Sequence, residues 1–199
     1  HNRGGGAVWS RAQLEDVLDA ARRSSLKTHL DGARLFNAHV ASGVALGELA
    51  DGFDTVSVCF SKGLGAPVGS AAAGESQTIR RVRRIRKMLG GGMRQSGLLA
   101  AACIHALDHH VERLADDHEH AGLRADAANV QTNILFIVVD PDAFAEGTHG
   151  LVRELESRGV RVLAAGPTTI RAVTNLMVDR PGIERAIEAF RETVASIAV

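Results

Sequence analysis

The stretch that decides the fold is Asp54–Ser70, DTVSVCFSKGLGAPVGS, and Lys62 lies near its centre. From Val56 to Phe60 the apolar residues alternate with smaller ones, which is typical of a half-buried strand, and glycines take over directly after Lys62. This pattern predicts a lysine at the carboxyl end of a strand, where ligands bind in open α/β sheets. The alternative is a solvated loop lysine, because lysines are common on protein surfaces.

A second strand is predicted to end upstream of the first. Leu26–Leu30 (LKTHL) has the pattern of a short strand, and residues 31–34 (DGAR) follow it directly. A helical stretch separates the two strands, so a right-handed strand–helix–strand unit turns both strand ends to one edge of a sheet. Asp31, Arg34 and Lys62 would then converge. A lysine that forms a Schiff base and an aspartate that keeps a pyridine nitrogen protonated are the usual protein contributions to pyridoxal phosphate (PLP) chemistry.

Three longer motifs extend this pattern along the chain. They are His29–Ala38 (HLDGARLFNA), Ser61–Ser70 (SKGLGAPVGS) and Lys87–Gly97 (KMLGGGMRQSG). In sequence, order and separation they resemble the low-specificity L-threonine aldolases, PLP enzymes of the aspartate-aminotransferase-like fold. A weaker resemblance continues to the C-terminus, so that nearly all 199 residues are similar to the later portion of a longer enzyme. The resemblance implies an α/β fold, with the second half of a fold type I large domain in residues 1–120 and a small α+β C-terminal domain in residues 121–199.

The resemblance also implies a role for charged residues in these motifs. Lys62 would be the catalytic residue and would hold the cofactor. The other cofactor-binding residues would be Asp31, Arg34, Ser61 and Arg94, and the substrate-binding residues would be Arg34, Lys87 and Arg171. In the family, the residue at the position of Arg94 reaches the PLP phosphate of a neighbouring subunit. Without the resemblance, Arg94 is equally a surface cap at a helix start, and Arg171 a solvent-facing strand arginine.

The implied activity is that of an aldehyde-lyase. Such an enzyme cleaves the amino-acid substrate L-threonine or L-allo-threonine to glycine and acetaldehyde, and it works as a homodimer or homotetramer. The family's phosphate cradle, its stacking aromatic residue and its suspected catalytic histidine correspond to sequence upstream of His1, so we expect little or no activity if the 199 residues are the whole chain. Another PLP-dependent lyase or aminotransferase of the same fold stays open, as does a non-catalytic remnant.

Composition excludes several other classes of protein. The formal net charge is zero, so no global field attracts the chain to nucleic acid or to a membrane surface. No apolar run approaches the roughly 18–20 residues that span a bilayer. Cys59 and Cys103 are too few for a disulfide framework, and we expect them to be buried free thiols in a cytoplasmic protein.

Two clusters of polar residues allow a second interpretation each. The predicted helix at 77–88 carries five arginines and Lys87, which could neutralise phosphates, but no aromatic residues are interleaved with them, so a solvated or subunit-contacting helix is favoured over a nucleic-acid site. His105 and His109 have the spacing of zinc ligands on a helix. Because the sequence specifies no third ligand and acidic residues flank the pair, we expect no metal site.

The remaining elements follow from periodicity and capping signals. Ser10 and Gln13 have the pattern of a capping box before a helix. Further helices are predicted at 35–50 with an interruption at Gly43, and at 77–88, 96–120, 149–157 and 179–198. Further strands are predicted at 70–74, 134–139, 160–163 and 169–173.

Overall fold

The computed structural model describes residues 5–122, 130–140, 144 and 146–196. The chain forms two compact units: Val8–Ala115, called the N-terminal unit, and Asp116–Val199 together with His1–Ala7, called the C-terminal unit. Each unit is considered separately. The domain limits implied by the resemblance stay a prediction, and residues 123–129, just after the implied limit, lie outside the described part.

The N-terminal unit begins with helix α1 (Arg11–Arg23), and its predicted capping box is present. The Gln13 backbone N–H donates to Ser10 Oγ at 3.3 Å, and the Ser10 backbone N–H donates to Gln13 Oε1 at 2.8 Å. These two bonds satisfy backbone donors that a helix start leaves unpaired. The helix is then held to the unit by Leu18, which is buried.

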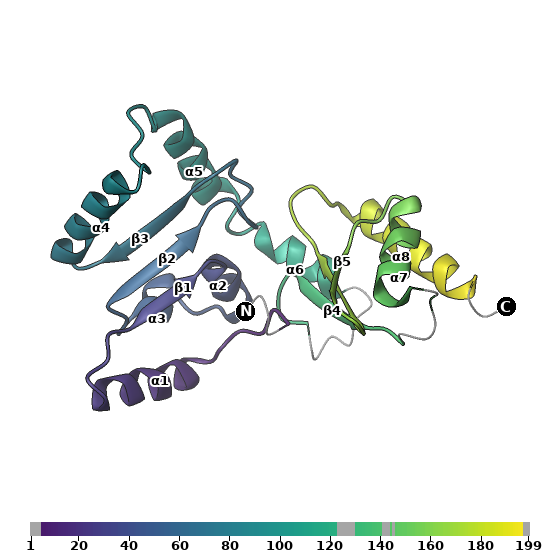
Figure 1. The fold of residues 1–199 in the computed structure, drawn as a ribbon, viewed down its shortest axis with the longest axis horizontal. Coiled ribbons are helices and arrows are strands. Elements are labelled where there is room, and N and C mark those ends of the chain that lie inside the picture. Colours follow the sequence, from purple (N-terminus) through teal and green to yellow (C-terminus); the bar gives the residue numbers. More distant parts are fainter. Residues whose placement is uncertain (1–4, 123–129, 141–143, 145, 197–199) are drawn as a thin grey trace. The chain divides into compact units, whose positions relative to one another are not determined.

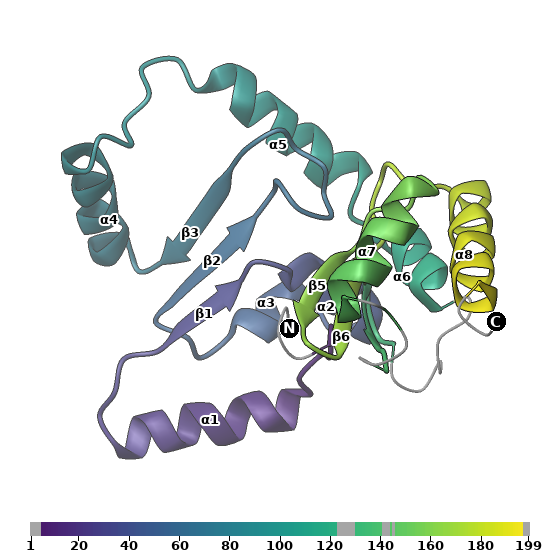
Figure 2. The same cartoon turned by 45° about the vertical axis from the view of Figure 1, so that its right-hand side comes forward.

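A three-stranded sheet forms the centre of this unit (Figures 1 and 2). Strand β1 (His29–Gly32) pairs in parallel with β2 (Thr55–Cys59), and β3 (Ser70–Gly74) pairs antiparallel with β2. Helices α2 (Leu35–Ser42) and α3 (Leu46–Ala50) connect the parallel pair. The predicted strand–helix–strand unit is therefore confirmed, and the carboxyl ends of β1 and β2 lie at one edge of the sheet.

The predicted position of the first strand was wrong by a few residues. It was expected at 26–30, whereas β1 runs from His29 to Gly32 and includes Asp31. The reason is a side chain: Asp54 Oδ2 accepts hydrogen bonds from the Thr28 backbone N–H at 2.8 Å and from Thr28 Oγ1 at 3.0 Å. Because these side-chain bonds engage Thr28, the regular pairing between β1 and β2 begins only at His29.

The predicted helix at 96–120 is two helices. Helix α4 (Ser76–Met88) is followed by α5 (Gly97–His109), and α6 (Leu114–Gly122) begins after a turn in which the Leu114 N–H donates to Val111 O at 3.1 Å. The turn buries Leu114 completely, among residues of a core cluster with Phe36 and Leu64. Burial of this leucine explains why the helix does not continue.

The C-terminal unit is an α+β unit. Its antiparallel sheet has the order β4 (Ile134–Val138), β6 (Thr169–Val173), β5 (Leu163–Gly166). Helices α7 (Gly147–Ser157) and α8 (Arg180–Ala195) lie on one side of this sheet (Figure 1). Apolar residues of α7 form its core with β6 and neighbouring segments: Leu151, Leu155, Val139, Val162 and Ile170.

One strand of this unit also begins later than predicted. It was expected at 160–163, but β5 starts at Leu163. The Val160 N–H donates to Leu155 O at 2.9 Å and thereby completes the end of α7, and Val162 packs in the core beside that helix. Residues 160–162 therefore belong to the helix end and the core rather than to the sheet ladder.

No helix in the described part of the chain is long and apolar enough to cross a membrane.

Candidate active site

Four of the predicted site residues lie on or directly after β1 and β2, the two strands whose carboxyl ends share one edge of the sheet. Asp31 lies opposite Ser57 in the parallel pair, and Gly32 lies opposite Val58. A Cβ atom at Gly32 would stand 2.6 Å from the Ser57 carbonyl oxygen, so only glycine allows the two strands to run this close. Arg34 follows as the N-cap residue of α2, and Ser61 and Lys62 follow β2.

Asp31 presents one carboxylate oxygen outward from this edge. Its Oδ1 accepts a hydrogen bond from the Ala33 backbone N–H at 3.2 Å, which fixes the orientation of the carboxylate. Its Oδ2 has no hydrogen-bond partner in the part of the chain that the structure describes, and the residue is exposed. Asp31 can therefore accept a hydrogen bond from a bound group.

Lys62 lies in a tight loop between β2 and β3. Three backbone hydrogen bonds define the loop: Phe60 N–H to Gly69 O at 3.0 Å, Ala66 N–H to Phe60 O at 3.0 Å, and Gly65 N–H to Lys62 O at 2.9 Å. Ser61 and Lys62 are exposed, and within the described residues neither side chain makes a hydrogen bond or an ion pair. The loop therefore holds the Lys62 backbone while leaving its amine available.

Three residues shape this loop, and no role in it was predicted for them from the sequence. Gly63 packs so closely that a Cβ atom there would lie 2.8 Å from Leu114 Cδ2 and 3.3 Å from Asn37 Oδ1. His110 contacts the loop through the Leu64 carbonyl at 2.7 Å. Asn37 could have been noticed in the sequence, because it is a polar residue beside the apolar residues at the start of α2. His110 could not, because it lies in a polar stretch where a histidine does not stand out.

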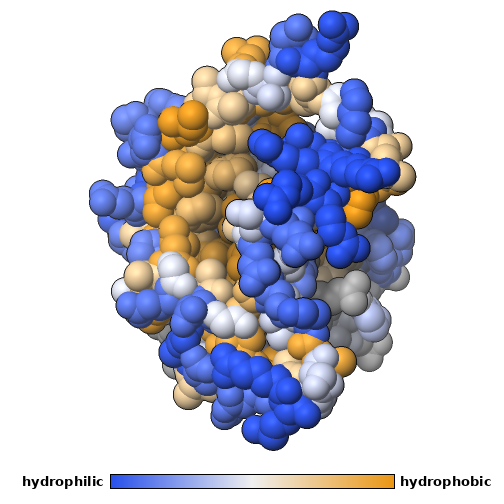
Figure 3. All heavy atoms as spheres, turned by 90° about the vertical axis from the view of Figure 1, so that its left-hand side faces the viewer, coloured by the Kyte–Doolittle hydropathy of each residue, from blue (hydrophilic) through white to orange (hydrophobic). Residues whose placement is uncertain are grey.

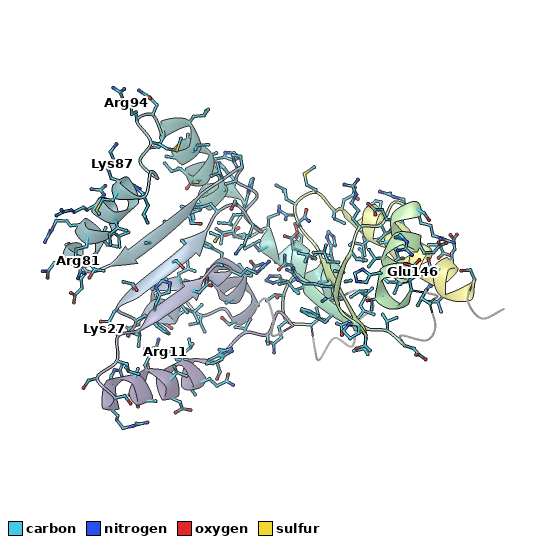
Figure 4. All side chains as sticks on the ribbon, in the orientation of Figure 1. Arg11, Lys27, Arg81, Lys87, Arg94 and Glu146 are labelled. Atoms are coloured by element: carbon cyan, nitrogen blue, oxygen red, sulfur yellow. The ribbon has the colours of Figure 1, made fainter. Side chains whose placement is uncertain are left out.

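Lys87 and Arg94 lie away from the Lys62 loop. Lys87 is at the end of α4 and Arg94 in the segment before α5, and both are exposed (Figure 4). The Lys62 loop meets the opposite end of α5, at His110. Since α5 has 13 residues, it separates the two places by about 20 Å of helix. Within one chain, Arg94 is therefore not brought to Lys62.

Arg171 belongs to the C-terminal unit. It lies on β6, the central strand, opposite Phe136 of β4 and Leu163 of β5. The residue is half-buried rather than solvent-facing, and its Nε is a buried atom without a hydrogen-bond partner among the described residues. An orphaned guanidinium nitrogen of this kind is costly unless a ligand pairs with it.

Two other expectations concern thiols and histidines. Cys59 and Cys103 are free thiols, but both are half-buried, so the expectation of full burial was wrong. The rings of His105 and His109 contact each other, with centroids 4.4 Å apart. Among the described residues, no group of three or more His, Cys, Asp or Glu side chains is arranged to hold a metal ion.

Asp54 fixes β1 and β2 at the ends opposite the site. Besides its bonds with Thr28, it accepts a hydrogen bond from Lys27 Nζ at 2.7 Å. The Lys27 bond, followed by those of Thr28, lowers the pKa of Asp54 from its usual 3.8 to about 2. Because β1 carries Asp31 and β2 leads into the Lys62 loop, this carboxylate contributes indirectly to the alignment of the site.

Stability should depend on the Asp54 charge in a defined pH range. A depressed pKa means that the stabilisation is fully present above about pH 4 and is lost as the pH falls through about 2. We expect Asp54→Asn to have a lower thermal midpoint than wild type at pH 7, and the difference to shrink between pH 4 and pH 2. Asp51→Asn is the control, since Asp51 is exposed and its contact with Arg11 is 3.5 Å long. A difference that stays constant down to pH 2 would contradict this role.

Comparisons with known proteins were made for the whole chain. A family model described as beta-eliminating lyase matches residues 1–143. The chain is 35% identical, over 99% of its length, to low-specificity L-threonine aldolase 1 of Arabidopsis thaliana. It is 40% identical, over 96% of its length, to the low specificity L-threonine aldolase of Escherichia coli (strain K12). It spans 58% of the length of each of these relatives.

A solved structure of a threonine aldolase is similar to this chain in fold. The threonine aldolase of Leishmania major matches with a TM-score of 0.74 at 20% sequence identity, over 94% of this chain and 57% of that one. The resemblance and the predicted fold are thereby confirmed: a large-domain portion of the PLP-dependent transferase type followed by a smaller α+β portion.

Proposed function

Since this chain belongs to the beta-eliminating lyase family, we propose that it catalyses the PLP-dependent cleavage of L-threonine or L-allo-threonine to glycine and acetaldehyde. The observation that supports this proposal best is the available amine of Lys62 at the strand edge that also carries Asp31. The two curated relatives reported above bear threonine aldolase names, which favours a β-hydroxy-α-amino acid as substrate.

The residues present fit PLP in two respects. Lys62 Nζ and Asp31 Oδ2, the atoms expected to meet the cofactor aldehyde and its pyridine nitrogen, have no partner in the described part of the chain. In the C-terminal unit, the buried and unpaired Nε of Arg171 is suited to a carboxylate. Both units therefore contain polar groups whose hydrogen bonds a ligand could complete.

Each residue has a distinct task in this proposal. When bound, PLP supplies the electron sink for the bond that breaks at Cα. Lys62 holds the cofactor, and the Asp31 carboxylate keeps the proton on the pyridine nitrogen. Arg34 and Arg171 bind the substrate carboxylate and so orient the bond to be cleaved. Ser61 and Arg94 bind the phosphate, and Lys87 lines the substrate site.

The position of Arg94 favours a site that more than one copy of the chain completes. Because α5 separates Arg94 from the Lys62 loop of the same chain, we propose that Arg94 serves the site of a second copy, together with Lys87, which packs against Gly92. Figure 3 supports such an assembly, since apolar side chains gather beside strongly hydrophilic ones on the face that it shows. The exposed apolar residues of α4, α5 and the segment between them are Val82, Ile85, Met88, Leu89, Met93, Leu98, Ile104 and Leu107. A surface of this kind is typical of a contact between protein chains. A homodimer or homotetramer is proposed on these grounds.

We also propose that the protein works in the cytoplasm. Cys59 and Cys103 are free and half-buried. Thiols that stay reduced are characteristic of a reducing compartment.

Absorbance and lysine mapping test the proposal directly. The sequence contains three lysines, at positions 27, 62 and 87, so a reduced cofactor adduct can be assigned unambiguously by mass spectrometry. The purified chain is mixed with PLP, treated with borohydride and digested, and a parallel sample is incubated with L-threonine. We expect an adduct on Lys62, and any threonine cleavage should give glycine and acetaldehyde in equal amounts.

The products separate this proposal from its alternatives. A keto acid formed in place of acetaldehyde would indicate an aminotransferase. A folded chain that gives no adduct on Lys62 would contradict the proposed function of this chain and favour a non-catalytic role.

A further inference from the structure

We propose that His110 is a positioning residue that fixes the Lys62 loop through the Leu64 carbonyl. The inference rests on the proposed function only in treating Lys62 as the cofactor lysine. The hydrogen bond itself joins residues 46 positions apart, from the C-cap of α5 to the loop between β2 and β3.

The hydrogen bond has a defined direction. A carbonyl oxygen only accepts, so Nδ1 of His110 carries the proton that it donates to Leu64 O, at 2.7 Å. His110 is half-buried and Leu64 is only 2% exposed. Loss of the donor would leave a carbonyl without a partner at a buried residue, which is more costly than loss of an exposed hydrogen bond.

The bond matters because it joins α5 to the part of the loop next to Lys62. The hydrogen bonds from Gly65 to Lys62 and from Ala66 to Phe60 are local and define the shape of the loop. A second bond from α5, from Cys103 Sγ to Val68 O, is long at 3.5 Å and reaches the loop six residues after Lys62. Leu64 is two residues after Lys62 and packs beside Leu114, so apolar contacts hold the loop without setting its direction. His110 adds a short directional hydrogen bond between α5 and the part of the loop next to Lys62.

The ring of His110 is itself oriented by a neighbour. The His105 ring meets it edge-on, at 89° with centroids 5.3 Å apart. This contact limits rotation of the His110 side chain, so Nδ1 stays directed at the Leu64 carbonyl. His109 also contacts His105, at 4.4 Å, but makes no hydrogen bond with the loop.

Three variants separate the hydrogen bond from packing. His110→Leu introduces an apolar side chain of roughly similar bulk and removes the hydrogen-bond donor. His110→Asn restores an N–H close to the position of Nδ1. His109→Leu is the matched control, because it changes the adjacent histidine and leaves the bond intact.

Hydrogen exchange measures the anchoring without any cofactor. We expect the amides of Gly65 and Ala66 to exchange about tenfold faster in His110→Leu, and near the wild-type rate in His110→Asn and His109→Leu. Amides of β2, which lie in the sheet ladder, should be unchanged in all three and show that each variant is folded. Equal exchange in His110→Leu and wild type would overturn the inference. Equally fast exchange in His110→Asn and His110→Leu would also overturn it, because ring packing would then be the cause.

Borohydride trapping then tests whether the hydrogen bond of His110 affects the position of Lys62. At limiting PLP, we expect the adduct on Lys62 to fall several-fold in His110→Leu, relative to adducts on Lys27 and Lys87, and to recover in His110→Asn. Unchanged trapping in His110→Leu would overturn the positioning role. If wild type forms no adduct on Lys62, the proposed function fails, while the exchange rates still decide whether His110 anchors the loop.

Discussion

Lys62→Ala is expected to abolish the specific PLP adduct and, in a chain that cleaves threonine, to lower this cleavage by at least about a thousandfold. The other two lysines cannot replace it. Lys27 donates a hydrogen bond to Asp54, and this bond raises its pKa and keeps the amine protonated. Lys87 is exposed near the end of α4, outside the loop that carries Lys62. Lys62→Arg should behave in the same way, since a guanidinium keeps the charge but does not form the covalent bond.

Lys27→Ala provides the control for this experiment. It removes one of the alternative lysines without touching the sheet edge, so the adduct on Lys62 and the rate of cleavage should persist. Peptide mapping of the reduced samples and acetaldehyde release are the two measurements. A reduced adduct of wild-type yield in Lys62→Ala would show that another amine holds the cofactor, and the assignment of Lys62 would be wrong.

The residues at the sheet edge were predictable because their signals are local. Alternation from Val56 to Phe60 followed by glycines marks a strand end, and the same logic applies at Asp31. Two parallel strands joined by a helix must present their carboxyl ends to one edge. The placement of Asp31 on β1 and of Lys62 after the end of β2 therefore followed from sequence order and the rules of sheet topology.

The errors occurred where a distant side chain competes with a local pattern. Asp54 bonds with Thr28, 26 residues earlier, and so delays the start of β1. The spacing of apolar residues from 96 to 120 allows one continuous helix, and the break before Leu114 depends on a core that only the folded unit contains. The tie from His110 to Leu64 is of the same kind, because nothing near either residue in the sequence indicates the other.

The close packing of Gly63 leads to a prediction about stability. In Gly63→Ala the new methyl group would stand 2.8 Å from Leu114 Cδ2, and Leu114 is fully buried, so it has no free space into which to move. We expect a loss of about 1–3 kcal/mol in the free energy of unfolding, measured by urea denaturation. Gly47→Ala is the matched control, because nothing lies within 4 Å of a Cβ atom there and Gly47 is in helix α3. That variant should be neutral or up to about 1 kcal/mol more stable than wild type.

A double variant identifies the clash as the cause. Leu114→Ala removes Cδ2, so the alanine at position 63 gains room when both changes are combined. Leu114→Ala alone should cost about 2–5 kcal/mol, because it leaves a cavity in the core. The double variant should lose less than the sum of the two single losses, since the residues are in contact. Strictly additive losses would show that Gly63 is not held against Leu114.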